Sequence, residues 1–81
     1  MKYNLFEEVV LGSDVPEKGL KKGDVATVVE HHPMPGGEDG YSLEVFNALG
    51  DTIAVITVRG SLIDSLKEDE VLSVRSLARG S

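Results

Sequence analysis

The residues with the clearest capacity for chemistry are two adjacent histidines, His31 and His32, with Glu38 and Asp39 close behind them. Imidazole and carboxylate groups are common zinc ligands, and a structural zinc ion takes four ligands. Adjacent residues of a strand point to opposite faces, so the two histidines cannot bind one ion unless the chain bends there. A polar entry to a loop is the simpler interpretation, and we expect neither a metal nor any other cofactor.

Covalent and acid–base catalysis also lack a recognisable set of residues. The chain has no cysteine. Its serines Ser42, Ser61 and Ser65 do not stand in a glycine-rich nucleophile elbow, and no histidine is near them in sequence. Carboxylates are abundant, but an acid–base pair needs a cleft that shifts their pKa values. We therefore predict that the chain is not an enzyme and takes no small-molecule substrate.

Phosphate recognition has two candidate features. The pair Gly36-Gly37 is followed by neither a Gly-Lys-Ser/Thr sequence nor a helix, so it predicts a flexible turn. A basic cluster of Lys18, Lys21 and Lys22 is flanked by acidic residues, and the net charge of the chain is −6. Nucleic acids attract proteins through their Lys and Arg residues, so this acidity opposes binding to DNA or RNA. Nucleic-acid binding through the lysine cluster is kept as the alternative function.

Length and composition describe the scaffold that must position these residues. A chain of 81 residues corresponds to a single domain, for which we expect an ordered core over about 4–75 and a frayed tail at 76–81. No apolar run approaches the roughly 20 residues that span a bilayer, and the N-terminus lacks an apolar signal core. With no cysteine to form disulfides, these features predict a cytoplasmic protein that does not bind membranes.

Five short segments have the alternation or the β-branched composition of strands. They are residues 5–11, 25–30, 41–47, 52–58 and 70–74. A long loop over 12–19 follows the first segment, and we expect Leu20 to anchor it to the core. Residues 31–40, with two prolines and three glycines, predict a second loop. Residues 48–51 predict a tight turn in which Gly50 takes positive φ, and 61–66 predict a single helical turn.

The side-chain pattern of these segments predicts which faces are buried. Leu5, Val9 and Leu11 share one face of the first segment. In the third segment Tyr41, Leu43 and Val45 should point inward, which leaves Glu44 and Phe46 outward. The fourth segment is apolar on both faces, so either Ile53 and Val55 or Ala54, Ile56 and Val58 must join that outer face.

An apolar outer face needs an explanation, because soluble monomers rarely expose a large contiguous apolar patch. Either the loop over 13–22 or the C-terminal residues cover it, or it is a contact surface. An aromatic residue among aliphatic ones with a charged rim is typical of protein interfaces. An acidic run before the last segment could attract a basic partner. The candidate partner-binding residues are therefore Glu44, Phe46, Ile53, Val55, Glu68, Asp69 and Glu70.

The order of elements, with a helical turn before the last strand, predicts an all-β fold, a small five-stranded SH3-like barrel. Closure of such a barrel removes exposed edges. The glycine-led stretch over 22–30 resembles the opening of KOW-type and related SH3-like domains. The stretches LFEEVV (5–10), VPEKGLKKGD (15–24) and TIAVITV (52–58) resemble, over about residues 4–74, the bacterial family called domain of unknown function 4926.

That resemblance implies the barrel and a small stand-alone protein. It also implies that some members are encoded beside a partner, as antitoxins and immunity proteins are. It supplies no catalytic residues. Together, the residues and the resemblance predict a module that binds another protein or a second copy of itself, and the alternative is a KOW-like nucleic-acid-binding barrel.

Overall fold

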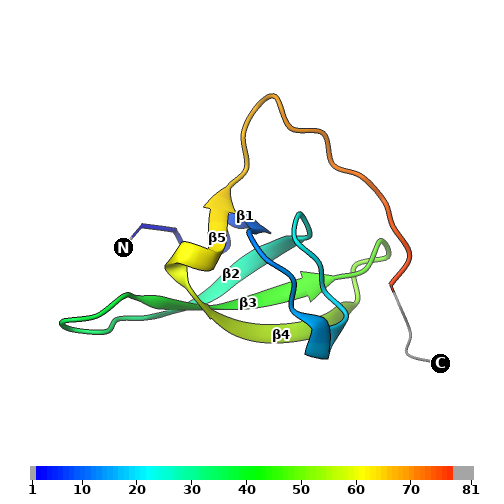
Figure 1. Cartoon of the computed structure of the whole chain (residues 1–81). Helices are drawn as coiled ribbons and strands as arrows, with labels where there is room; N and C mark the ends of the chain where they lie inside the picture. The colour runs from blue at the N-terminus through cyan, green and yellow to red at the C-terminus, as the bar shows by residue number, and fades with distance from the viewer. Residues whose placement is uncertain (1, 78–81) are drawn as a thin grey trace.

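The computed structural model describes residues 2–77, which form one antiparallel sheet of five strands with two short 3-10 helices (Figure 1). The strands are β1 (Glu8–Leu11), β2 (Val25–His32), β3 (Gly40–Phe46), β4 (Thr52–Arg59) and β5 (Ile63–Ser65). The helices are η1 (Pro16–Lys18) and η2 (Gly60–Leu62). The strand order is β4-β3-β2-β1-β5. The predicted all-β fold, with a helical turn before the last strand, is confirmed and is compatible with a small barrel.

The core lies on one face of the sheet, where every second side chain of each strand points. The predicted inward residues Tyr41, Leu43 and Val45 are all buried, and Leu20 anchors the loop before β2 as expected. No member of the core is more than 7% exposed. The buried apolar residues are Tyr3, Val9, Leu11, Leu20, Ala26, Val28, Tyr41, Leu43, Val45, Ile56 and Ile63.

Tyr3 joins the N-terminus to two distant strands, a role that its sequence context does not predict. Its hydroxyl donates to the carbonyl oxygen of Ile63 at 2.9 Å. The hydroxyl of Tyr41 accepts hydrogen bonds from the backbone N–H groups of Lys2 and Tyr3. The two tyrosine rings meet edge to face with their centroids 5.3 Å apart. The N-terminal residues therefore seal one end of the core between β3 and β5.

The first strand begins later than predicted. Phe6 has a φ of +66°, which breaks the extended conformation, and Leu5 and Phe6 form the tip of a turn. The N–H of Glu7 donates to the Asn4 carbonyl, and the Asn4 N–H donates to the Glu7 side chain at 3.0 Å. Leu5 is consequently 49% exposed, so the prediction that it joins Val9 in the core is wrong.

The bounds of one predicted loop and of the predicted helical turn differ from those in the structure. His31 and His32 continue β2 and pair with Tyr41 and Gly40 of β3, so the loop between these strands is only residues 33–39. The helical turn predicted over 61–66 is confined to η2. The tight turn before β4 is confirmed, because Gly50 has a φ of +89° and the Asn47 side chain accepts from two backbone N–H groups within the turn.

The prediction of a last strand over 70–74 is wrong. The last strand is β5, and its residue Ile63 lies opposite Leu11 in the ladder with β1. β1 is flanked by β2 and β5, so neither of its edges remains for a later strand. Residues 66–77 form a C-terminal segment without regular structure. Of the predicted frayed tail, 76–77 belong to this segment and 78–81 lie outside the described residues.

Within residues 2–77, no helix has the length and apolar character to cross a membrane.

Candidate functional site

The outward side of the β3–β4 hairpin brings together four of the predicted site residues, and we call it the hairpin face: Glu44, Phe46, Ile53 and Val55. Glu44 lies directly opposite Val55 in the ladder. A register shift follows Val45, and after it Phe46 and Ile53 line the same groove. Ala54, Ile56 and Val58 pack on the core side, which settles the two parities that the sequence left open.

The hairpin face is apolar, with a fixed charge at its edge. Phe46 is 42% exposed, Ile53 38% and Val55 55%. The Thr52 hydroxyl donates to a carboxylate oxygen of Glu44 at 3.0 Å, which holds that charge beside the apolar side chains. An exposed aromatic flanked by aliphatic groups and a polar rim has the composition of an interface core.

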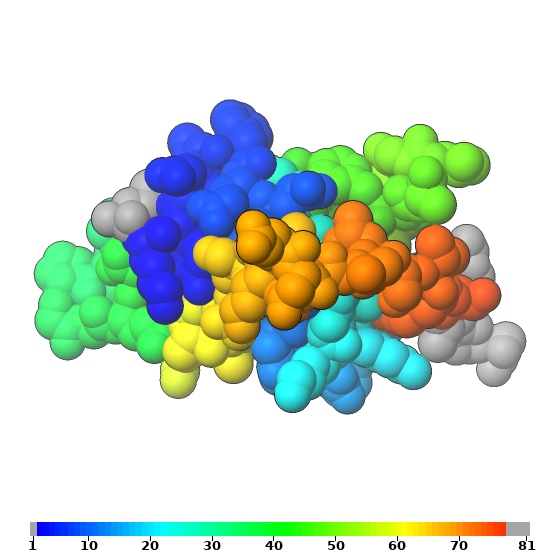
Figure 2. Space-filling view, turned by 90° about the horizontal axis from the view of Figure 1, so that it is seen from above, coloured from blue at the N-terminus to red at the C-terminus, as the bar shows by residue number. Residues whose placement is uncertain are grey.

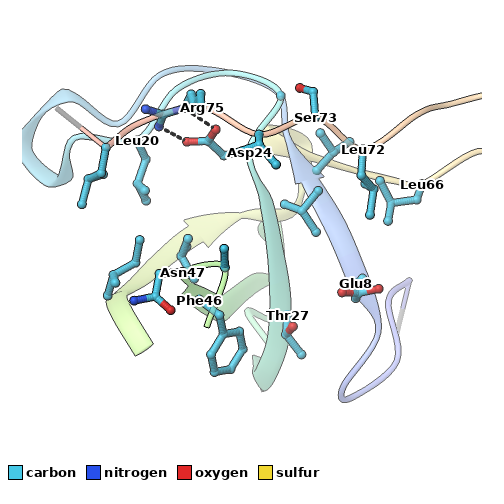
Figure 3. A pocket seen from close by; sticks show the side chains of 18 of the residues that line it. Glu8, Leu20, Asp24, Thr27, Phe46, Asn47, Leu66, Leu72, Ser73 and Arg75 are labelled. Atoms are coloured by element: carbon cyan, nitrogen blue, oxygen red, sulfur yellow. Dashed lines mark hydrogen bonds and ion pairs between the residues drawn. The ribbon is translucent and has the colours of Figure 1, made fainter. Parts of the chain in front are cut away.

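A groove of about 760 Å³ adjoins the hairpin face. Its floor is the outer side of β1, β2 and the hairpin, and its far wall is the C-terminal segment. Figure 3 shows Thr27 and Phe46 on one side of this groove and Leu72 and Arg75 on the other. The groove is open to solvent along its length, and its lining combines apolar side chains with charged ones, namely Glu8, Lys22, Asp24, Glu70 and Arg75. Because it is not enclosed, it resembles a docking surface more than a catalytic cleft.

The C-terminal segment crosses over the sheet with its central apolar side chains in solvent. Figure 2 shows it, in orange, between the blue N-terminal part of the chain and the cyan turn that precedes β2. Val71 is 90% exposed, Leu72 65% and Val74 93%. The segment therefore forms one wall of the groove, but it leaves its own apolar side chains and most of the hairpin face in solvent.

One residue ties the far end of this segment to the sheet. Arg75 donates from Nε to Asp24 Oδ1 at 2.8 Å, from Nη2 to Asp24 Oδ2, and from Nη2 to the Gly19 carbonyl at 3.1 Å. The hydrogen bonds from Arg75 hold the pKa of Asp24 below its usual value of 3.8, helped by the Lys21 backbone N–H and opposed by partial burial.

The acidic run lies on the C-terminal segment. Lys67 and Glu70 close a turn through two hydrogen bonds, one of which joins the Lys67 N–H to the Glu70 carboxylate at 2.6 Å. Glu68 and Asp69 are the exposed residues within that turn. Glu70 lines the groove together with Phe46, whereas Glu68 and Asp69 do not.

The two histidines have different partners. His31 Nε2 lies 2.8 Å from Asp39 Oδ2, and this hydrogen bond, with one from the Met34 N–H, lowers the pKa of Asp39. His32 Nε2 lies 2.7 Å from the Ser42 hydroxyl, which in turn contacts Thr57. No group of three or more His, Cys, Asp or Glu side chains with metal-binding geometry occurs among residues 2–77.

The lysine cluster is interleaved with acidic groups. Lys18, Lys21 and Lys22 are exposed. Asp24 accepts from the Lys21 backbone N–H, and Asp14 accepts from that of Lys22, both at 2.8 Å. Negative charge therefore lies within the same loop as the lysines, and the electrostatic field of the cluster is weak.

Comparison with known proteins gives a family and no activity. No curated protein and no solved structure matches the chain significantly. The family model described as a domain of unknown function (DUF4926) matches residues 5–65. That range runs from the turn before β1 to the end of β5, so it includes every strand and excludes the C-terminal segment. The chain thus belongs to the DUF4926 family.

Proposed function

We propose that this chain is a non-catalytic protein-binding module that docks another protein on its hairpin face. The observation that carries the proposal is the exposure of Phe46, Ile53 and Val55 on the outward side of the paired strands β3 and β4. Contiguous apolar surface on a soluble protein marks an interaction site more often than an incidental feature. We also assign the sheet to the SH3-like class, because its strand order and the helix before β5 match that barrel.

The hairpin face is built to bind with little loss of conformational freedom. Its four residues lie on paired strands, and the turn that joins these strands is fixed by Asn47 and Gly50. Glu44 is already oriented by Thr52. Preorganised side chains lose less rotamer entropy on binding, so more of the contact energy is retained as affinity. Phe46 would be the anchor of the interface, because aromatic residues commonly dominate binding energy.

Charge points to a basic partner. The net charge is −6, Glu44 borders the apolar patch, and Glu70 lies across the groove from Phe46. Complementary charge at the rim steers a partner toward the site and raises the association rate more than the affinity. Negative charge also opposes binding to nucleic acid, because the carboxylates of Asp14 and Asp24 lie within the loop that carries the lysine cluster.

The test replaces Phe46 with aspartate and compares this variant with Leu49→Asp. Leu49 is 88% exposed but lies in the turn beyond the hairpin face, so it controls for the general effect of a new charge. A photo-crosslinking residue at 46 or 49 identifies the partner, and calorimetry with that purified partner measures affinity. We expect Phe46→Asp to weaken binding by at least about 30-fold, in line with the loss of an interface anchor.

Leu49→Asp should bind as the wild type does, and both variants should retain the circular dichroism spectrum and thermal unfolding of the parent. Equal binding by the two variants would show that the hairpin face is not the site. A parallel titration with single- and double-stranded oligonucleotides at low salt tests the alternative. Salt-sensitive binding that is lost when Lys18, Lys21 and Lys22 become alanine would replace the proposal with nucleic-acid recognition.

A further inference from the structure

The outer edge of β4 has no partner within the described chain. β4 pairs with β3 along one side, and the strand order places it at the end of the sheet. Among residues 2–77, no turn or loop backbone group is hydrogen-bonded to Thr52–Arg59. An eight-residue edge with free N–H and C=O groups is a template for another strand. Its sequence, TIAVITVR, is mainly apolar and β-branched, and it contains no residue that opposes strand addition except Arg59.

A groove of about 500 Å³ runs beside this edge. One wall is the second half of β4, residues 55–59, and the other is the loop over 13–18 with the helix η1. A strand added to a sheet lies about 4.8 Å from its neighbour. The groove therefore offers both the backbone edge and a side wall for an extended chain.

The same protein carries an irregular segment that is paired with no strand. Residues 70–74, EVLSV, have the composition of a strand, yet Val71, Leu72 and Val74 are exposed. The segment is held at both ends, because Ser65 pairs with Val9 in the sheet and Arg75 is bound to Asp24. Its apolar side chains are thus kept accessible, away from its own β4. None of residues 66–77 lines the groove beside β4 in the same chain.

The charges of the two elements are complementary in the antiparallel orientation. Arg59, at the end of β4, is the only charged residue of that strand and has no ion-pair partner within residues 2–77. Glu68, Asp69 and Glu70 precede the apolar residues of the C-terminal segment. When this segment runs antiparallel to β4, its acidic end lies at Arg59 and its apolar residues lie along Val55–Val58.

We propose that two copies of this chain exchange their C-terminal segments, so that residues 70–74 of each copy add as an antiparallel strand to the free edge of β4 in the other. The arrangement is two-fold symmetric, and each copy gives one segment and receives one, which closes the assembly as a dimer. Strand addition uses the backbone edge of β4. The two surfaces share Val55, but Phe46 and Ile53 of the hairpin face line the other groove and not the one beside this edge. The dimer therefore does not depend on the proposed partner-binding function.

Charge reversal tests the exchange in the full-length protein. Sedimentation velocity across a dilution series should show a wild-type dimer. Arg59→Glu and Glu70→Lys each turn an attraction into a repulsion at both ends of the dimer, and each should weaken it by about tenfold. In an equimolar mixture of the two variants, the heterodimer has one contact of reversed polarity and one wild-type contact. Both contacts are attractive, so the mixture should recover dimerisation.

A substitution at Leu72 tests the backbone pairing. Leu72→Pro removes an N–H donor from the segment and should weaken the dimer by about 100-fold or more. Leu72→Val keeps this donor, so the dimer should remain intact. Because Leu72 lies outside the sheet, both variants should retain the circular dichroism spectrum.

A wild-type monomer at every concentration, or no recovery in the charge-reversal mixture, would overturn the exchange. A dimer that survives Leu72→Pro but is lost in Phe46→Asp would place the contact on the hairpin face instead. Loss of partner binding with an intact dimer, or the reverse, separates this proposal from the proposed function.

Discussion

β5 and the segment at 70–74 lie close together in sequence, but only β5 is part of the sheet. β5 spans Ile63–Ser65 and has one apolar residue, which is 2% exposed. The segment EVLSV has three apolar residues, and Val71 is 90% exposed. Composition favours the second as a strand. The difference is that β5 occupies the second edge of β1, where its residue Ile63 is buried in the core. A strand therefore depends on an available edge and a buried face more than on its own residues.

The largest expected effect in this comparison is the loss of a core leucine. Leu43 lies in the middle of β3 and is fully buried, so Leu43→Ala should lower the free energy of unfolding by about 2–5 kcal/mol. Leu72→Ala removes the same atoms from an exposed position and should change it by less than about 0.5 kcal/mol. Urea unfolding followed by circular dichroism, at a concentration where the chain is monomeric, measures both values.

Leu43→Val, which removes a single methylene group, is a milder form of the first variant that retains a measurable transition should Leu43→Ala not fold. A loss of stability from Leu72→Ala as large as that from Leu43→Ala would mean that the C-terminal segment is packed in solution. The exposed C-terminal segment would then not differ in packing from the buried core around Leu43.

The sequence predicts those parts of the fold that local pattern determines. Alternation in the third segment identifies Tyr41, Leu43 and Val45 as inward, and the glycine at 50 identifies the turn before β4. The same alternation predicts that Glu44 and Phe46 point outward, and in the structure both residues pair with residues of β4. These features depend on residues that are neighbours in sequence, so a single strand or turn contains the necessary information.

Features that depend on contacts between distant residues are not encoded in the local sequence pattern. The turn at Leu5 and Phe6 interrupts an apolar run, and there Phe6 takes a positive φ that is uncommon for such a residue while its N–H donates to the distant Val28 carbonyl at 2.6 Å. Tyr3 is buried through its bonds to Ile63 and Tyr41. The groove beside the hairpin face depends on the contact between Arg75 and Asp24, which are 51 positions apart. Nothing in the local sequence pairs these residues.

Tyr3 gives an effect of intermediate size. Tyr3→Phe keeps the ring in the core but removes the hydrogen bond to the Ile63 carbonyl, and this should destabilise the protein by about 1–2 kcal/mol. Leu5→Ala, two residues away and half exposed, should have a smaller effect, within about 0.5 kcal/mol. Thermal and urea unfolding of the two variants compare the values. If Leu5→Ala were the more damaging change, the turn at the N-terminus would have to be packed in solution.

The smallest expected effect on stability comes from Arg75, although its effect on titration should be clear. Because the hydrogen bonds of Arg75 lower the pKa of Asp24, Arg75→Ala should raise that pKa toward 3.8. A depressed carboxyl pKa contributes stability that is present above the unfolded value and is lost as the pH falls through the folded value. The attachment of the C-terminal segment should therefore persist at neutral pH and weaken only as the pH falls below 3.8.

Carbon-13 NMR titration of the Asp24 carboxyl measures this shift, and Arg59→Ala serves as the matched control because Arg59 makes no contact with Asp24. Amide exchange at Val71, Leu72 and Val74 should change little in Arg75→Ala, since these residues are already exposed. An Asp24 pKa that does not respond to Arg75→Ala would mean that the segment is not tethered in solution. The exchange of segments between two copies would then begin from a freely moving chain, with a larger loss of conformational entropy on pairing.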